Sequence, residues 1–327
     1  MNKMNKVIQK STKQFLIVEE EEVPKPIIKW VGGKSQILDK LITEFPTTIN
    51  NYYEIFLGGG SVLLALLTSI KNGLIVLNGT VHAYDINEAL IYVYKNIQSH
   101  HLELFDKTQE LIKEFNESGL DDNDEQNKNR KPTDIIEAKQ SKHNYYYWIR
   151  ENYNKLLDKK TLTGSAMFIF LNKTCFRGVY REGPNGFNVP YGHYANPEII
   201  NKEHLEKIHY LIAGVIFEAM DFETSLSKIS DENDYAYLDP PYAPETNKSF
   251  VGYTKAGFKI DMHTKLFEAC KKLTDEKKKF MMSNADVTLI RNNFTPMNYS
   301  VESIICKRAI NSKKPQSKAI EVIIKNY

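Results

Sequence analysis

The sequence predicts an α/β fold in which one largely parallel sheet is interrupted by a mostly helical insertion. Apolar runs of strand length occur on both sides of the chain's middle third, and several of them end in glycine or aspartate. Between these runs, residues 88–165 are rich in Glu, Lys, Asn and Leu with helical spacing. A chain of 327 residues has room for one large domain or two ordinary ones.

The composition is that of a soluble globular protein, with 42% hydrophobic and 26% charged residues. We see no uncharged apolar run of about 18 residues and no signal peptide, so we expect no membrane partner. Cys175, Cys270 and Cys306 lie far apart and lack metal-ligand spacing. Because such cysteines suit a reducing compartment, we expect a cytoplasmic protein without a metal site.

The first part of the chain has the pattern of half a nucleotide-binding sheet. Residues 1–25, which include an acidic run, are interpreted as a mobile or loosely attached N-terminal arm. A strand over Tyr52–Leu57 then runs into Gly58, Gly59 and Gly60, and a helix is expected over Ser61–Ser69. A second strand, Leu74–Tyr84, ends at Asp85. Strand, glycine turn, helix, strand and acid follow one another in a Rossmann-like half.

The remaining elements divide the chain into domains. The helical middle contains a polar stretch, Gly119–Pro132, and is followed by an aromatic, glycine-rich segment, Phe168–Tyr194, with loop and β-hairpin character. Further strands are expected at Val215–Phe217, Tyr235–Leu238, Lys279–Ser283 and Ala319–Lys325. We therefore expect an arm at 1–25, a sheet domain made of 26–87 and 201–327, and an inserted domain at 88–200.

The formal net charge of +2 identifies no partner, but the basic residues are unevenly distributed. They concentrate at 271–279 and near the C-terminus, at Lys307, Arg308, Lys313, Lys314 and Lys318. Basic stripes attract phosphate backbones. For 271–279 taken alone, a solvated helix face is an equally good interpretation.

The strongest motif is Asp239-Pro240-Pro241-Tyr242, directly after the expected strand Tyr235–Leu238. In a parallel sheet, ligands bind beyond the carboxyl ends of the strands. The prolines fix φ and remove N–H donors, so a stiff, exposed set of acceptors remains beside an aromatic ring. The Asp239 carboxylate and the Pro240 carbonyl suit the two N–H groups of an exocyclic amine, and Tyr242 suits stacking on its ring. The alternative is a type I or VI turn at a strand end.

The turn at Phe56–Ser61 suits a cofactor. Glycines after a first strand let a ligand approach the backbone closely, and Asp85, at the next strand end, stands where an acid binds ribose hydroxyls. A second glycine motif, Gly33-Lys34-Ser35, resembles the end of a phosphate-binding Walker loop. The first glycine of that loop is replaced by Ile28, so we reject a nucleotide triphosphatase.

Basic and aromatic residues cluster at Leu171–Arg181 and Gly186–Gly192. On a glycine-rich hairpin such side chains suit groove insertion and base stacking. A packed β-hairpin with ordinary aromatic filling is the alternative.

In this order and from about Lys29 to the C-terminus, the motifs resemble the Dam-type (D12 class) N6-adenine DNA methyltransferases. The resemblance implies a Rossmann-like AdoMet-dependent methyltransferase domain, an inserted target-recognition domain carrying a β-hairpin, S-adenosyl-L-methionine (AdoMet) as methyl donor and double-stranded DNA as substrate. It also implies that the target adenine is flipped out of the duplex.

The resemblance assigns residues to three roles. Those expected to hold the flipped base and catalyse transfer are Asp239, Pro240 and Tyr242. Those expected around AdoMet are Trp30, Lys34, Phe56, Gly58, Gly59, Gly60, Asp85, Asp221 and Phe222. Those expected to contact DNA are Lys29, Phe176, Arg177, Val179, Arg181, Pro190 and Tyr194, with Phe176 as a wedge and Arg181 suited to a guanine edge.

Two departures from the family pattern leave the recognition sequence open between GATC and CATG. Arg177 stands where the bacterial Dam enzymes carry a small amide, and the insertion around 119–143 is longer. A cognate restriction endonuclease as a partner is open as well.

Two alternatives in function remain, another substrate for the same chemistry and a protein without catalysis. Similar acceptor motifs serve amino-group methylation of cytosine N4, RNA bases or a glutamine amide, and a DNA-binding module with a decayed cofactor site is the non-enzymatic alternative. Cytosine C5 chemistry is excluded, because it needs a thiolate that typically follows proline. Here Thr174, Ala269 and Ile305 precede the cysteines.

Overall fold

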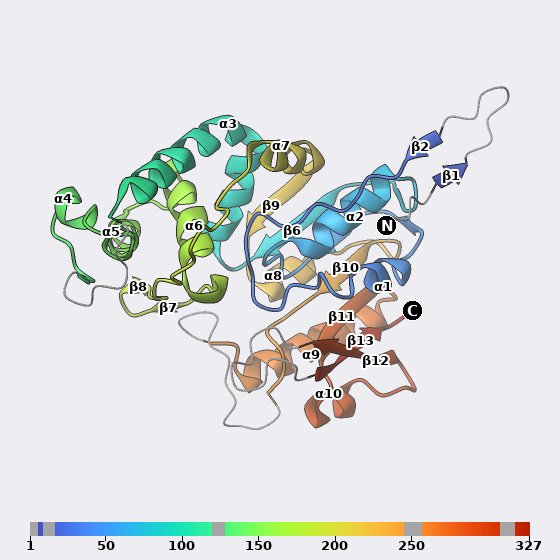
Figure 1. Cartoon of the computed structure of the whole chain (residues 1–327). Helices are drawn as coiled ribbons and strands as arrows, with labels where there is room; N and C mark the ends of the chain where they lie inside the picture. The colour runs from blue at the N-terminus through green and yellow to red at the C-terminus, as the bar shows by residue number, and fades with distance from the viewer. Residues whose placement is uncertain (1–5, 9–16, 120–127, 245–256, 308–317) are drawn as a thin grey trace.

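A computed structural model describes residues 6–8, 17–119, 128–244, 257–307 and 318–327 of the chain. Its centre is a seven-stranded sheet in the order β12-β13-β11-β10-β4-β6-β9 (Figure 1). The strands are β4 (Tyr52–Glu54), β6 (Val81–Asp85), β9 (Val215–Ala219), β10 (Tyr235–Leu238), β11 (Lys279–Ala285), β12 (Ser300–Lys307) and β13 (Lys318–Lys325).

The order of the strands creates a switch point between β4 and β10. From β4 the chain moves outward through β6 to β9, and it returns to build β10 and β11 on the other side of β4. These five strands are parallel, whereas β13 runs antiparallel between β11 and β12. Because ligands in open α/β sheets bind at the carboxyl ends beside a switch point, the fold places a site beyond β4 and β10.

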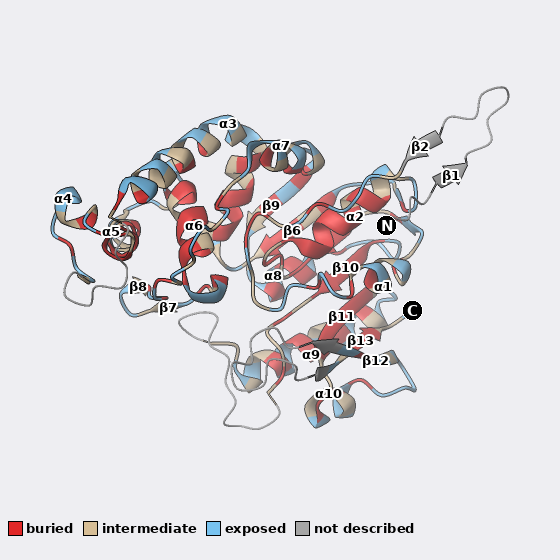
Figure 2. Ribbon diagram, viewed as in Figure 1, coloured by how far each residue is buried: buried red, intermediate tan, exposed pale blue. Residues whose placement is uncertain are grey.

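Two apolar clusters cover the two faces of the sheet. Alternate side chains of one strand go to opposite faces, so Tyr235 and Tyr237 join one cluster while Ala236 and Leu238 join the other. The first cluster includes side chains of α1 (Leu38–Thr43), α2 (Ser61–Lys71) and α7 (Lys202–Leu211). The second includes side chains of α8 (Phe222–Ser227), α9 (Ile260–Asp275) and α10 (Thr288–Asn293). Figure 2 shows the buried sheet between these helices.

A helical group extends from one edge of the sheet (Figure 1). It consists of α3 (Glu88–Glu117), α4 (Ile135–Ala138), α5 (Lys142–Lys155) and α6 (Leu162–Thr174), followed by a 3-10 turn, η2 (Phe176–Gly178), and the hairpin β7 (Glu182–Gly183) and β8 (Gly186–Phe187). The first half of α3 packs against the sheet, since the Tyr94 ring stacks on Phe217 of β9 with ring centroids 5.2 Å apart. The helix is kinked at His100, and its second half enters the helical group.

Most of the expected strands are confirmed, but two expectations about local structure are wrong. The run Leu74–Tyr84 is not one strand: β5 (Val76–Leu77) pairs with β3 (Thr48–Ile49) in a separate small sheet, and β6 begins only at Val81. The loop segment expected from Phe168 begins at Cys175, because Phe168–Thr174 completes α6. Ala319–Lys325 is confirmed within β13, and the helix at Ser61–Ser69 extends to Lys71.

The expected arm has two parts. Strands β1 (Lys6–Ile8) and β2 (Ile17–Glu19) form their own small sheet. Further along, Glu21 exchanges two hydrogen bonds with the Asn72 side chain, each 3.1 Å long, and pairs with Lys71 at 2.6 Å. Glu21 is therefore bonded to the residues at the end of α2.

The basic residues noted above fall into two groups. On and after α9, Lys271 pairs with Asp275 and Lys278 pairs with Glu276, which favours the solvated-face interpretation for 271–279. Lys307 and Lys318 are paired through their backbones at the end of the β12–β13 ladder. Arg308, Lys313 and Lys314 lie outside the described residues, as does most of the polar stretch Gly119–Pro132.

Candidate active site

The two strongest motifs of the sequence meet at the switch point of the sheet. The turn Phe56–Gly60 follows β4, and Asp239–Tyr242 follows β10, the neighbouring strand. The Ile55 N–H donates to the Tyr237 carbonyl at 3.0 Å, and the Leu57 N–H donates to the Tyr84 carbonyl at 2.8 Å. These bonds continue the strand pairing into the turn, and a cavity of about 560 Å³ opens beyond it.

Most residues expected to bind a cofactor line this cavity. The lining includes Trp30, Lys34, Phe56, Gly58, Gly59, Asp85, Asp221 and Phe222, together with Asp239, Pro240 and Tyr242. Gly60 is outside this lining. It precedes α2 with φ 71°, and a Cβ there would lie 2.7 Å from the Tyr94 hydroxyl, so its role in this structure is to admit Tyr94.

The glycine turn is shaped by a tryptophan. Gly58 has φ 50°, and a Cβ at this position would lie 2.7 Å from Trp30 Cδ1. A side chain here would therefore require both a strained backbone and a displaced indole ring. On its other side, Trp30 stacks on Tyr180 with ring centroids 5.6 Å apart. The indole thus connects the cavity wall to the loop that precedes the hairpin.

Asp85 fixes the turn from the end of β6. Its carboxylate accepts the Gly58 N–H at 3.0 Å and the Asn87 N–H at 2.9 Å. Burial raises the pKa of Asp85, and these two N–H groups offset part of the rise. A carboxylate oxygen accepts more than one hydrogen bond, so Asp85 retains capacity for hydroxyl groups of a ligand in the cavity.

Aromatic rings form another part of the wall. Phe56 lies 6.0 Å from Phe222, and Phe258 lies 6.1 Å from Phe56 and 5.8 Å from Phe222, measured between ring centroids. Asp221 begins α8 and accepts the Thr224 N–H at 2.8 Å. This backbone hydrogen bond lowers the pKa of Asp221 and stabilises the start of α8. Apolar rings beside a carboxylate suit a planar base with an exocyclic amine.

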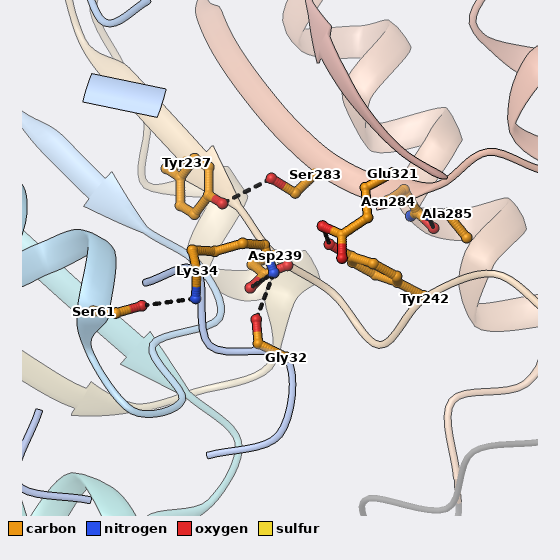
Figure 3. A network of polar contacts seen from close by, with 10 residues as sticks. All are labelled: Gly32, Lys34, Ser61, Tyr237, Asp239, Tyr242, Ser283, Asn284, Ala285 and Glu321. Carbon is orange, nitrogen blue, oxygen red and sulfur yellow. Dashed lines mark hydrogen bonds and ion pairs between the residues drawn. The ribbon is translucent and has the colours of Figure 1, made fainter. Parts of the chain in front are cut away.

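Asp239 is not the exposed acceptor that the sequence predicts. Its carboxylate is bound by the Lys34 ammonium at 2.6 Å, and its side chain is 21% exposed while that of Lys34 is 3% exposed (Figure 3). Lys34 also donates to the Gly32 carbonyl at 2.7 Å and lies 5.0 Å from the centre of the Tyr242 ring. Burial raises the pKa of Asp239, and Lys34 offsets part of that rise.

A second buried acid, Glu54, was not among the site residues predicted from the sequence. Glu54, the last residue of β4, lines the cavity and is 2% exposed, and its Oε2 accepts the Tyr52 hydroxyl at 2.9 Å. Burial raises the pKa of Glu54 to about 8. The feature of the sequence that could have indicated Glu54 is its place in a strand-like run shortly before the glycine turn. Glu321 of β13 and Asn284 of β11 were missed as well, and both contact the Asp239–Ala243 segment or its side chains.

The residues expected to contact DNA gather around one short segment. The backbone N–H of Phe176 donates to the Pro190 carbonyl at 2.8 Å, and that of Arg177 donates to the Tyr194 hydroxyl at 2.8 Å. Arg177 has φ 57°, and the Phe176 ring beside it is 49% exposed. Lys29 Nζ lies 4.8 Å from the centre of the Tyr194 ring. The structure therefore brings together side chains from opposite ends of this loop and hairpin.

Two further residues complete this surface. Arg181 is exposed, and its Nε donates to Asn188 Oδ1 at 2.7 Å across the hairpin. Val179 is partly buried and follows η2.

The backbone of Lys29 is held by Asn172 of α6, which accepts the Lys29 N–H and donates to its carbonyl, both at 2.8 Å. Asn172 was not predicted from the sequence as a functional residue, and its contacts join the Lys29 backbone to α6 and to the Gly178 carbonyl of η2.

No helix in the described ranges has the length and apolar character needed to cross a bilayer. The same ranges contain no group of three or more His, Cys, Asp or Glu side chains placed to bind a metal ion.

Known proteins similar to this chain agree with the geometry of the site. The model of the D12 class N6 adenine-specific DNA methyltransferase family matches residues 30–310. The Type II methyltransferase M.MjaIII of Methanocaldococcus jannaschii is 33% identical, over 93% of this chain and 99% of its own length. The Retron Ec67 DNA adenine methylase of Escherichia coli is 27% identical, over 91% and 90%. The DNA adenine methylase of Escherichia coli K12 is 25% identical, over 92% and 94%. The chain therefore belongs to the D12 class of N6-adenine-specific DNA methyltransferases.

Proposed function

We propose that this DNA adenine methyltransferase flips its target adenine out of the duplex and holds N6 between Asp239 and Pro240. The observation that carries the proposal is the junction of two motifs at one switch point. The acceptor residues after β10 and the glycine turn after β4 line the same cavity of about 560 Å³. A methyl donor and a methyl acceptor bound to these two loops would therefore lie next to each other.

The cavity fits AdoMet by its chemistry. Asp85 would hold the ribose hydroxyls, Phe56 and Phe222 would contact the adenine ring, and Asp221 would accept from its amino group. Gly58 and Gly59 leave room for a close approach to the backbone. When bound, AdoMet supplies a methyl group on a positively charged sulfur.

The side chains after β10 would prepare the acceptor nitrogen. The lone pair of adenine N6 is delocalised into the ring, which makes it a poor nucleophile. The Asp239 carboxylate and the Pro240 carbonyl would accept the two N–H groups, localise the lone pair and balance the positive charge that develops on N6. Tyr242 would stack on the ring, and transfer then depends mainly on positioning.

The loop and hairpin surface would bind the duplex around the flipped base. Phe176 is exposed beside Arg177, which suits a wedge between base pairs. Arg181 suits a guanine edge, and Lys29, Val179, Pro190 and Tyr194 complete the contacts. We assign residues 26–87 and 201–327 to catalysis and residues 88–200 to target recognition, acting on a short palindromic site, GATC or CATG.

The cellular setting follows from the substrate. The enzyme would work in the cytoplasm, where bacterial, phage and viral DNA is accessible. Two relatives carry the name type II methyltransferase, which supports a cognate restriction endonuclease acting on the same site as a partner.

The test is transfer of labelled methyl from AdoMet to unmethylated plasmid DNA, followed by digestion to nucleosides. We expect the label in N6-methyladenosine, and protection from either GATC-cutting or CATG-cutting endonucleases. Label in N4-methylcytosine, or in RNA but not DNA, would overturn the substrate proposal. Absence of AdoMet binding would favour a non-catalytic DNA-binding module, whereas AdoMet binding without transfer to DNA would point to an RNA or protein substrate.

A further inference from the structure

The Tyr242 hydroxyl is hydrogen-bonded to a carboxylate from a distant part of the chain. It donates to Glu321 Oε2 at 2.6 Å, and Figure 3 shows the Glu321 carboxylate beside the Tyr242 ring. Glu321 belongs to β13 and is 79 residues from Tyr242 in the sequence. Such a short bond between a hydroxyl and a carboxyl group is among the stronger hydrogen bonds of proteins.

The reversed direction of β13 explains how Glu321 reaches the site. The carboxyl ends of β4 and β10 lie at the cavity, and because β13 runs antiparallel, its beginning lies at this same edge of the sheet. Glu321 lies near that beginning, opposite Ala285 of β11. The next three residues, Val322, Ile323 and Ile324, are buried in the core. This packing fixes the position of β13 and therefore of the Glu321 backbone.

Two other contacts fix the same tyrosine and its loop. Lys34 Nζ lies 5.0 Å from the centre of the Tyr242 ring. The next residue, Ala243, donates its N–H to Asn284 Oδ1 at 2.9 Å, and Asn284 is fully buried. Burial raises the pKa of Tyr242, and the nearby carboxylates add to this rise, so the phenol stays a proton donor to Glu321. The ring is thereby held over its face by Lys34, at its hydroxyl by Glu321 and through the following backbone by Asn284 before any base is bound.

We propose that Glu321 is a positioning residue for methyl transfer, which fixes the Tyr242 ring by accepting its hydroxyl and so aligns the flipped adenine. The proposal rests on the stacking role of Tyr242 given above. A ring held at its tip does not have to be ordered when the base arrives, which lowers the conformational cost of forming the reactive complex. Loss of the acceptor should therefore reduce kcat more than it weakens AdoMet binding.

The test compares three single variants, Glu321→Ala, Glu321→Gln and Tyr242→Phe. It also includes the double variant that combines Glu321→Ala with Tyr242→Phe. We expect Glu321→Ala and Tyr242→Phe each to lower kcat by about tenfold, the effect of one hydrogen bond to a charged group. Because both remove the same bond, the double variant should be no slower than either single variant. Glu321→Gln retains an acceptor oxygen and should recover most of the rate.

A spectroscopic measurement distinguishes positioning from general structural support. With 2-aminopurine at the target position of the duplex, we expect the wild-type enzyme to quench the flipped base against Tyr242. Glu321→Ala should leave it brighter and more mobile. Glu302→Ala is the matched control, because Glu302 lies on the neighbouring strand, is exposed and pairs with Lys40. That variant should behave as wild type in both assays.

The outcomes separate this inference from the proposed function. Wild-type kcat in Glu321→Ala, or losses that multiply in the double variant, would overturn the inference. If Tyr242→Ala also leaves the rate and the 2-aminopurine signal unchanged, then the stacking role of Tyr242 fails as well. If Tyr242→Ala is impaired while Glu321→Ala is not, only the positioning role of Glu321 is lost.

Discussion

The Lys34 ammonium lies 2.6 Å from Asp239 Oδ2, although the two residues are 205 positions apart in the chain. One belongs to the glycine segment before α1 and the other to the loop after β10. A buried carboxylate without a cation would take up a proton readily, and a protonated Asp239 accepts hydrogen bonds poorly. The pair therefore connects the glycine segment near the N-terminus to the protonation state of the acceptor residue.

Replacement of Lys34 by methionine should reduce methylation and make it more dependent on pH. Burial already raises the pKa of Asp239, and loss of the cation removes the contribution that lowers it. We expect the acid limb of the kcat profile to move upward by about one pH unit or more. Lys40→Met is the control, because Lys40 pairs with Glu302 away from the cavity. An unshifted acid limb in Lys34→Met would show that the pair does not set the ionisation of Asp239.

Asp239→Ala should abolish most of the activity without unfolding the protein. The variant loses one of the two acceptors proposed for N6, and we expect kcat to fall by about 100-fold or more. Equilibrium binding of AdoMet and the thermal unfolding temperature serve as controls and should change little. Near-normal turnover would contradict the proposed mechanism.

Gly58→Ala should weaken AdoMet binding. The new Cβ would lie 2.7 Å from the Trp30 ring at a backbone φ of 50°, so the ring or the turn must move. We expect Kd to rise by about tenfold and stability to fall by about 1 kcal/mol, measured by calorimetry and by denaturant unfolding. Gly214→Ala is the matched control, since a Cβ there meets nothing within 4 Å. Equal affinities for the two variants would argue against a role for the turn in the cofactor site.

Glu54→Gln should change how the free energy of unfolding depends on pH. The folded-state pKa of Glu54 is raised from 4.5 to about 8, so between these values the folded protein retains a proton that the unfolded chain has released. The wild-type protein therefore loses stability as pH rises through this window, by at most about 1.4 kcal/mol per pH unit. Glu54→Gln lacks this loss, and its stability relative to wild type should increase from pH 5 to pH 8. Parallel pH profiles for the two proteins would mean that Glu54 is ionised in the folded state.

Arg181→Ala should relax the choice of DNA sequence. The bond from Arg181 Nε to Asn188 fixes the plane of an exposed guanidinium. We expect a loss of about 1–3 kcal/mol of discrimination at one base pair, measured as the ratio of kcat/KM on the preferred site and on single-base variants. Arg181→Lys keeps the charge but not the planar fork, so it should retain DNA affinity and still lose discrimination. An unchanged ratio in both variants would remove Arg181 from base recognition.

The sequence determined the local elements because their signals lie within a few neighbouring residues. The apolar run Tyr235–Leu238 and the acid at Asp85 were sufficient to place two strand ends correctly, whereas the strand expected over Tyr52–Leu57 ends at Glu54. The same local information failed for Phe168–Thr174, which was expected to be loop and hairpin. That part of α6 is buried on nearly every side, so it shows no apolar stripe on a polar helix.

Only the tertiary structure decided which of these strand ends meet. Strand order and the reversal of β13 depend on pairings between residues far apart in the chain, and no local pattern encodes them. For this reason the sequence predicted Asp239 as an exposed acceptor, whereas in the folded protein Lys34 binds it and Glu321 holds the tyrosine beside it. The sequence thus supplied the polar groups of the site, and long-range packing set their burial and their partners.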